Sequence, residues 1–419
     1  MLSTDTATRG SAAPSSAHPA TTPSAGASVA EERPELVARA AELRPLLAED
    51  AAQADRLCRL TDRVGEGITQ AGLMRMTTPR RAGGHGADAR TLLDVTTTLG
   101  GGCCSAAWVT GVLNVGNFVV SLFPEEAQDE VWADNPDART AQVLGRPAPD
   151  VESAPGGVVV SGQWAYMSGS TLAEWVGVLL ARGPEGGAPG PYFALLPRAD
   201  LDLKDTWHVT GMRGTGSNTF VARGVFVPAH RLLPYGPVLR GELTRQDAAT
   251  PYRNSLTGMF SLGLLGSLIG GADAALRLVR DKAPERPVAG STYASQADSP
   301  TAQLYLADAA ARTDSAKLHA RRLADCVDEY ALAERTADTD TRARCRMDSA
   351  RVAELCREAV DTLVTAYGSS AFQEGNPLQR IWRDVHVGSR HAGFGMGIPQ
   401  QLYGRSLVGK DPREVSLLV

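Results

Sequence analysis

The residues best suited to chemistry lie close together near the C-terminus, in the run Gln379–His391. This run combines the pair Arg383-Asp384 with two imidazoles, His386 and His391, and a glycine at position 388. Imidazole is the side chain that most readily exchanges a proton near neutral pH. The density of polar groups predicts a site, with a capped helix whose charges are solvated as the alternative.

Three segments with glycine and serine could contact a ligand: the first a flat ring, the second a phosphate group, and the third, through Trp108, a wall of a cofactor pocket. Ser161–Ser170 leads from one expected strand to the next, Gly211–Asn218 follows Trp207, and Gly101–Val109 opens a helix of small residues. Glycine allows close backbone approach, and a serine hydroxyl can donate to a ring nitrogen. The alternatives are a hairpin turn, a mobile turn and core packing, respectively. The second segment is not a dinucleotide fingerprint, because the third glycine and the following helix are missing.

A metal site is not expected. His386 and His391 are five residues apart and therefore do not stack on one helical face, and no cluster of thiolates or carboxylates accompanies them. The six cysteines form no Cys-x-x-Cys pair, and no secretory signal precedes them. This pattern predicts reduced thiols in a cytoplasmic protein.

The composition gives no reason to expect nucleic acid or a membrane as a partner. The formal net charge of the 419 residues is -5. Residues 1–30 are almost entirely Ala, Ser, Thr, Pro and Gly and are predicted to be a disordered tail. The apolar run 254–272 is interrupted by small residues and is predicted to be a buried helix.

The elements that must position these residues fall into three parts. Residues 31–138 have helical periodicity, with helix starts expected at Asp88 and Pro124. Residues 139–232 carry short β-rich runs and predict a small antiparallel barrel or sandwich. Residues 250–419 predict a four-helix, up-and-down bundle with helices over 254–280, 300–332, 340–368 and 377–391. The expected class is α+β, mainly α.

Together these features resemble the acyl-CoA dehydrogenase fold. The resemblance rests on the order of the three parts, on the two segments Gly162–Ser170 and Gly211–Ser217, and on Arg383-Asp384 near the end. Within that fold the chain is similar to the reduced-flavin monooxygenases, such as the oxygenase part of 4-hydroxyphenylacetate hydroxylase. The narrower resemblance is carried by Ser105–Val109, Tyr252-Arg253, Gly214–Ser217 and Ser389–His391.

One substitution separates the two chemistries. Acyl-CoA dehydrogenases of the common type carry a glutamate base shortly after the Arg-Asp pair, where this chain has Ala392. Abstraction of a proton from a thioester is therefore unsupported. The resemblance implies a functional histidine at His391, with a pKa near the working pH.

The resemblance implies a two-component enzyme. A separate NAD(P)H:flavin reductase would supply FMNH2 or FADH2, and O2 would add to form a C4a-hydroperoxyflavin that oxygenates a small molecule. His391 and Ser168 would be catalytic, and Asn117, Tyr166 and His391 would contact the substrate. The implied flavin contacts are Trp108, Ser105, Met167, Ser168, Gly169, Met212, Gly214, Thr215, Ser217 and Arg253.

The substrate stays open at this level. Phenol hydroxylases of this group often carry histidines after the tryptophan, where this chain has Val112–Asn117. An aromatic or polyketide-like intermediate in a pocket widened at Gly116 is the first interpretation, and N-oxygenation of an amino sugar, as in nitrososynthases, is the second. An acyl-CoA dehydrogenase with an unplaced base and a flavin-free binding protein are further alternatives. The family implies a homotetramer, a dimer of dimers, and the Gly-rich helix over 254–272 is expected to be buried in its interface.

Overall fold

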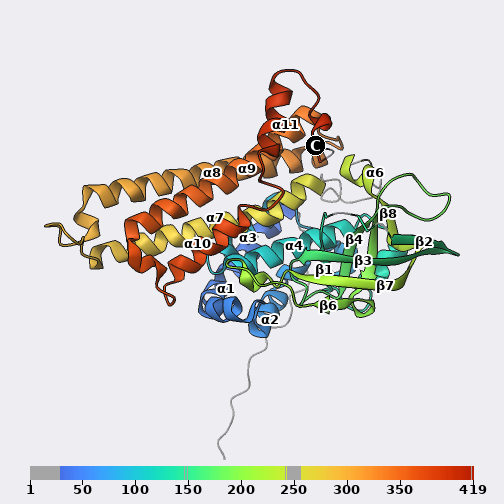
Figure 1. Cartoon of the computed structure of the whole chain (residues 1–419), viewed down its shortest axis with the longest axis horizontal. Helices are drawn as coiled ribbons and strands as arrows, with labels where there is room; N and C mark the ends of the chain where they lie inside the picture. Colours follow the sequence, from blue (N-terminus) through green and yellow to red (C-terminus); the bar gives the residue numbers. More distant parts are fainter. Residues whose placement is uncertain (1–28, 146, 149, 241, 243–255, 417) are drawn as a thin grey trace, which may run out of the picture.

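The computed structural model describes residues 29–145, 147–148, 150–240, 242, 256–416 and 418–419. Arg253 and nearly all of the expected tail lie outside these residues. The described chain forms helices, then two β-sheets, then long helices (Figure 1). The predicted α+β, mainly α class is confirmed.

The N-terminal part is helical, as its periodicity predicts. Asp88 begins α3 because its carboxylate accepts a hydrogen bond from the amide of Thr91, 2.7 Å away, and Pro124 is the residue before α5. Helix α4 is buried along its whole length, so it is the axis on which the other parts pack. The helices are α1 (Val29–Leu57), α2 (Asp62–Gln70), α3 (Ala89–Gly100), α4 (Cys104–Val120) and α5 (Glu125–Trp132).

The central part is a pair of four-stranded sheets with strand orders β1-β4-β5-β8 and β2-β3-β7-β6. All pairs are antiparallel except β1 with β4. The segment Ser161–Ser170 is not a hairpin, because most of it belongs to β3, which pairs with β7. The strands are β1 (Thr140–Gln142), β2 (Asp150–Ala154), β3 (Gly157–Met167), β4 (Trp175–Leu180), β5 (Tyr192–Pro197), β6 (Asp202–Lys204), β7 (Asn218–Pro228) and β8 (Leu232–Pro234).

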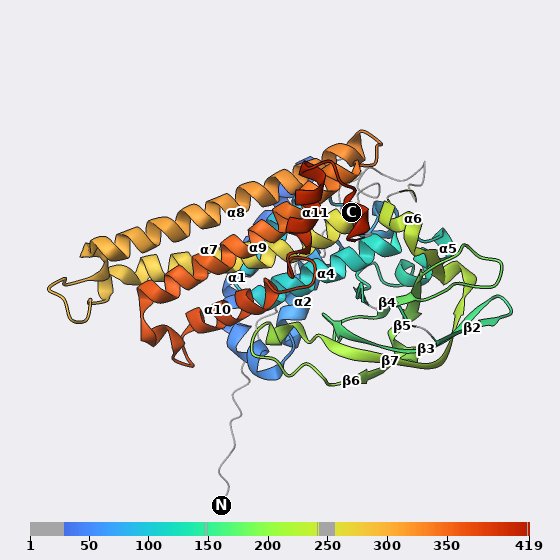
Figure 2. The same ribbon diagram turned by 45° about the horizontal axis from the view of Figure 1, so that its top comes forward.

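The C-terminal part contains three long helices, α7, α8 and α9, and the shorter α10, and together they extend away from the sheets (Figures 1 and 2). Helix α10 ends at Gly388, so His391 lies in the turn beyond it. A further helix, α11, packs on α9 and projects from the body (Figure 1). The helices are α6 (Tyr235–Arg240), α7 (Leu256–Lys282), α8 (Pro300–Leu332), α9 (Thr339–Tyr367), α10 (Pro377–Gly388) and α11 (Ile398–Leu407).

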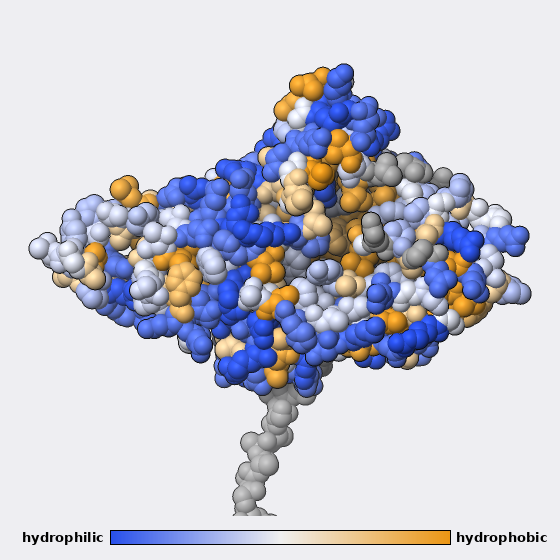
Figure 3. Space-filling model, in the orientation of Figure 1, coloured by the Kyte–Doolittle hydropathy of each residue, from blue (hydrophilic) through white to orange (hydrophobic). Residues whose placement is uncertain are grey.

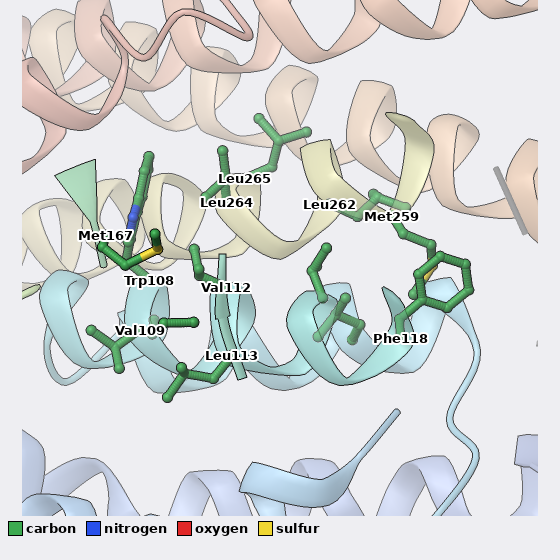
Figure 4. Close-up of a cluster of buried hydrophobic side chains, with 14 of the residues drawn as sticks. Trp108, Val109, Val112, Leu113, Phe118, Met167, Met259, Leu262, Leu264 and Leu265 are labelled. Atoms are coloured by element: carbon green, nitrogen blue, oxygen red, sulfur yellow. The ribbon is translucent and has the colours of Figure 1, made fainter. Parts of the chain in front are cut away.

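Helix α7 is long and apolar enough to cross a membrane, but 78% of that apolar window is buried inside the chain. It packs on α4, where Gly111 and Gly263 let the two backbones approach so closely that a Cβ at either position would overlap the other helix. Trp108 and Met167 lie together at one end of this contact (Figure 4). The small residues of α7 therefore serve contacts within the chain, and a role of this helix in a subunit interface stays a prediction.

The surface is mostly polar, with apolar side chains gathered in a hollow beneath the α11 projection (Figure 3). Three exposed leucines also lie along α8: Leu304 is 70% exposed, Leu318 66% and Leu332 69%.

Candidate active site

A chain of hydroxyl groups joins β3 to the segment before β7. The indole N–H of Trp108 donates to Ser168 Oγ at 3.2 Å, and Ser168 Oγ lies 2.8 Å from Ser217 Oγ. Ser217 Oγ lies 2.7 Å from Thr215 Oγ1, which donates to the carbonyl oxygen of Met212 at 2.8 Å. All five residues are buried.

The direction of this hydroxyl chain (Ser168, Ser217, Thr215) follows from its last bond. Because Thr215 gives its proton to a carbonyl, Ser217 must donate to Thr215, and Ser168 must donate to Ser217. Ser168 thus accepts from Trp108, donates to Ser217 and keeps one free lone pair. The group is set to accept one more hydrogen bond.

The segment that carries Thr215 and Ser217 is held by α10. The amide of Met212 donates to Asp384 Oδ1 at 2.6 Å, which holds Met212 in a left-handed conformation with φ of 54°. Burial raises the pKa of Asp384 to about 6. Arg383 makes a two-pronged ion pair with Asp55 of α1, at 3.1 and 3.0 Å. The Arg383-Asp384 pair therefore positions this segment between two helices.

The start of α4 closes against the same segment. A Cβ on Gly214 would lie 2.9 Å from the Cβ of Ser105, so only glycine permits this approach. The amide of Gly169 donates to the carbonyl of Thr215 at 2.8 Å. Ser105, Met167, Gly169 and Gly214 are thus brought beside the hydroxyl chain by β3, α4 and the segment before β7.

His391 is surrounded by aromatic rings. Its ring centroid lies 5.7 Å from that of Trp108 and 5.8 Å from those of Phe260 and Phe394. Burial, reinforced by the charge of Arg346, lowers the pKa of His391 to about 4. The imidazole is neutral at pH 7, so the expectation of a pKa near the working pH is wrong.

The tautomer of His391 is set by the backbone. The amide of Gly393 donates to Nδ1 at 3.1 Å, so the neutral ring carries its proton on Nε2. In this state Nε2 is a hydrogen-bond donor.

Two residues expected near the substrate have structural roles. The side chain of Asn117 is fully buried, donates to Met74, Thr78 and Ala138 and accepts from the backbone of Thr140, so it braces the fold and does not face a ligand. Gly116 does not widen a pocket, because a Cβ there would overlap the carbonyl of Thr140 in β1. Neither Asn117 nor Gly116 therefore belongs to the candidate site.

Tyr166 also lies apart from the group around His391. Its ring is 70% exposed and packs edge-to-face on Trp207, with the centroids 6.0 Å apart. A substrate held at Trp108 and His391 would have to reach the surface to touch it. Arg253 lies outside the described residues. Phe260, Phe394 and Arg346 were missed, because only the packing of α7, α9 and the turn after α10 brings them near His391.

The residues present fit a reduced flavin. Ser168 has one free acceptor position, which matches a ring N–H such as N5–H of a reduced flavin. Trp108 and Met212 supply flat and polarisable apolar surfaces on neighbouring elements, and a Cβ at Gly388 would touch both. Within the described residues, no group of three metal-binding side chains is present.

Comparison with known proteins agrees with this geometry. The family model for the acyl-CoA dehydrogenase C-terminal domain matches residues 262–395. The oxygenase subunit HsaA of a flavin-dependent monooxygenase from Rhodococcus jostii (strain RHA1) is 31% identical, over 84% of this chain and 92% of that protein. The oxygenase component of FADH(2)-dependent resorcinol hydroxylase from Rhizobium sp. (strain MTP-10005) is also 31% identical, over 90% of this chain and 95% of that protein.

A solved structure extends the match to the fold. XiaF from Streptomyces sp., in complex with FADH2 and glycerol, has a TM-score of 0.87 and 34% identity, covering 92% of this chain and 97% of that one. An oxygenase component of this type acts on O2 with reduced flavin made by a separate reductase. The chain therefore belongs to the oxygenase components of two-component flavin-dependent monooxygenases, which are built on the acyl-CoA dehydrogenase fold.

Proposed function

We propose that this oxygenase uses reduced FMN or FAD and O2, through a C4a-hydroperoxyflavin, to hydroxylate an aromatic or polyketide-like natural-product intermediate. The observation that carries the proposal is a pair of polar positions beside Trp108 that have no partner among the described residues. One is the free lone pair of Ser168, and the other is the Nε2–H of His391.

At the flavin end, Ser168 accepts the N5–H hydrogen bond of the reduced ring. Trp108 and Met212 wall the ring, and Thr215 holds Ser217 and Ser168 in the required orientation. The remaining contacts of the proposed flavin site are Ser105, Met167, Gly169, Gly214, Ser217 and Arg253. Because Ser168 already donates to Ser217, it favours a ring nitrogen that bears hydrogen over one that does not.

At the substrate end, His391 acts as a neutral hydrogen-bond donor. Its Nε2–H holds the reacting oxygen or the phenolic oxygen of the substrate, and the imidazole does not change charge at pH 7. The rings of Trp108, Phe260 and Phe394 surround the imidazole with apolar surface, which limits its contact with water and strengthens the hydrogen bond.

An aromatic substrate is supported in two ways. Rings around His391 offer edge-to-face contacts to another ring. Relatives include the resorcinol hydroxylase and a p-hydroxyphenylacetate 3-hydroxylase component from Acinetobacter baumannii, 26% identical over 88% of each chain.

For its partners, we propose a separate NAD(P)H:flavin reductase, a cytoplasmic location and a dimer of dimers. The surface that supports assembly is the row Leu304, Leu318 and Leu332 on α8, because exposed leucines at intervals of 14 residues lie near one helix face. Leu318→Lys should lower the mass measured by light scattering, while Leu407→Lys on α11 should not. An unchanged mass for Leu318→Lys would rule out this surface.

The function is tested with purified protein, a flavin reductase, NADH, flavin and 18O2. A panel of aromatics and amino sugars is incubated, and mass spectrometry follows incorporation of labelled oxygen. Labelled aromatic product supports the proposal, and labelled amino sugar replaces it with N-oxygenation. Anaerobic bleaching of oxidised flavin by an acyl-CoA, without oxygen transfer, would instead identify a dehydrogenase.

A further inference from the structure

A separate cavity lies between α7, α8 and α9. It encloses about 40 Å³, which is room for about three water molecules or one carboxylate group. Its lining combines apolar side chains with Ser261 of α7, Tyr330 of α8, and Arg342 and Arg346 of α9. None of the hydroxyl-chain residues lines it.

The unusual feature of this cavity is a buried positive charge. Arg346 is 7% exposed, its Nε has no hydrogen-bond partner, and it makes no ion pair within the described part of the chain. Arg342 also has a buried Nε without a hydrogen-bond partner among the described residues, although the carboxylates of Asp338 and Glu242 lie near enough to act on its charge. The nearby carboxylate of Asp348 is already engaged by Arg322 and His319, at 2.9 Å in each case.

Such a charge needs a counter-ion. A guanidinium stays protonated inside proteins, and burial of one without an anion is strongly unfavourable. Its planar set of donors matches a carboxylate, which also has the size of this cavity. We propose that the cavity binds a carboxylate carried by the substrate, with Arg346 as the residue that selects for it. This inference rests on the proposed function, because it assigns the substrate class of the same enzyme.

Helix α7 contacts both the cavity and His391. Ser261 lines the cavity, and the next side chain, Phe260, packs on the ring of His391. Arg346 also acts on His391 electrostatically, since its charge contributes to the lowered pKa of the imidazole. The proposal accordingly places the carboxylate at Arg346 and the ring of the substrate beside Phe260 and the imidazole.

The anion site is first tested without substrate. Thermal unfolding of the full-length protein is measured in sodium acetate and in sodium chloride at equal ionic strength, for wild type, Arg346→Met and the exposed control Arg321→Met. Acetate should raise the Tm of wild type and Arg321→Met only. Without acetate, Arg346→Met should be at least as stable as wild type, because it removes an unpaired buried charge.

Substrate selection is tested with matched pairs, p-hydroxyphenylacetate against its methyl ester and indole-3-acetate against 3-methylindole. In calorimetric titrations of wild type, the Kd of each acid should be lower than that of its neutral partner by a factor of about ten or more. Arg346→Met should abolish the preference, and Arg346→Lys should restore part of it. Should Arg346→Met fold poorly, Arg342→Met is used in its place, and it should weaken the preference.

Three results would overturn the inference. The first is an equal acetate effect on the Tm of wild type and Arg346→Met, and the second is equal binding of acids and their neutral partners. The third is that Arg346→Met weakens the binding of FMN but not of riboflavin, which would assign the charge to the flavin phosphate. Failure of oxygen transfer with every substrate, together with an intact acetate effect, would refute the proposed function and leave the anion site standing.

Discussion

The two sides of Trp108 differ in how far the protein satisfies its own polar groups. On one side the hydroxyl chain is bonded from end to end, and its direction is fixed by the carbonyl of Met212. On the other, the ring of His391 lies among aromatic rings, and Arg346 is buried with no ion-pair partner in the part of the chain that the structure describes. We call the first side the prebuilt frame, because its hydroxyl groups are positioned by the protein alone. We call the second the incomplete side, because its polar groups have no partner among the described residues and need a ligand to supply one.

Substitution of His391 should have the largest effect on this contrast. We expect His391→Ala to lower product formed per flavin oxidised by about 100-fold or more, because the hydrogen bond at the reacting oxygen is lost. Reduced-flavin affinity should be unchanged, since the frame is intact. The control His386→Ala removes an imidazole bonded to Asp361 and should retain activity. Normal product formation by His391→Ala would end its catalytic assignment.

Low pH should destabilise the folded protein through His391, which lies on the incomplete side. The unfolded chain protonates His391 near pH 6.5, whereas the folded chain resists protonation until about pH 4. The unfolded state therefore binds more protons in this window, and the free energy of unfolding falls as pH falls from 6.5 to 4, by at most about 3 kcal/mol from this residue. Urea titrations of wild type and His391→Leu at pH 7 and pH 4.5 measure the difference. Equal losses in both proteins would contradict the prediction.

The prebuilt frame should break where backbones touch. A Cβ at Gly211 would overlap the carbonyl of Arg383, so Gly211→Ala should lower the free energy of unfolding by about 1–3 kcal/mol and weaken flavin binding. Gly404 in α11 has open space around it, and Gly404→Ala should be neutral or stabilising. Denaturant titrations measure the free energy of unfolding of both variants. Equal values for Gly211→Ala and Gly404→Ala would contradict the prediction.

Ser168→Ala should have the smallest effect. It removes one acceptor while the walls of the site remain, so we expect about tenfold weaker binding of reduced flavin. Oxidised flavin should lose less, because its N5 carries no hydrogen. Anaerobic titrations of both redox states, with Ser153→Ala on the exposed strand β2 as the control, separate the two effects. An equal loss for both states would reject the deduced hydroxyl direction.

The sequence predicted elements with a long, regular period much better than contacts between them. The expected helices over 300–332 and 340–368 match α8 and α9 closely, because amphipathic repeats of that length are unambiguous. Strands of three residues, such as β1 and β6, are too short to have a period, and the ten-residue helix α11 was missed.

The site shows the same division. The glycine and serine segments named from the sequence do come together in the structure, but the bond from Ser168 to Ser217 joins residues 49 positions apart, and only the pairing of β3 with β7 makes that contact possible. The interpretation of Gly116 was wrong because a small residue on α4 can equally serve a neighbouring backbone. Asn117 was wrong for the related reason that amides are common as internal braces.

The proton on His391 is governed by a peptide N–H, that of Gly393, and not by an acidic side chain. Every amino acid except proline has this backbone donor, so most substitutions at position 393 would leave the tautomer of the imidazole unchanged. Among relatives of this enzyme, proline two places after the histidine would consequently be a stronger mark of changed chemistry than any gain or loss of charge there.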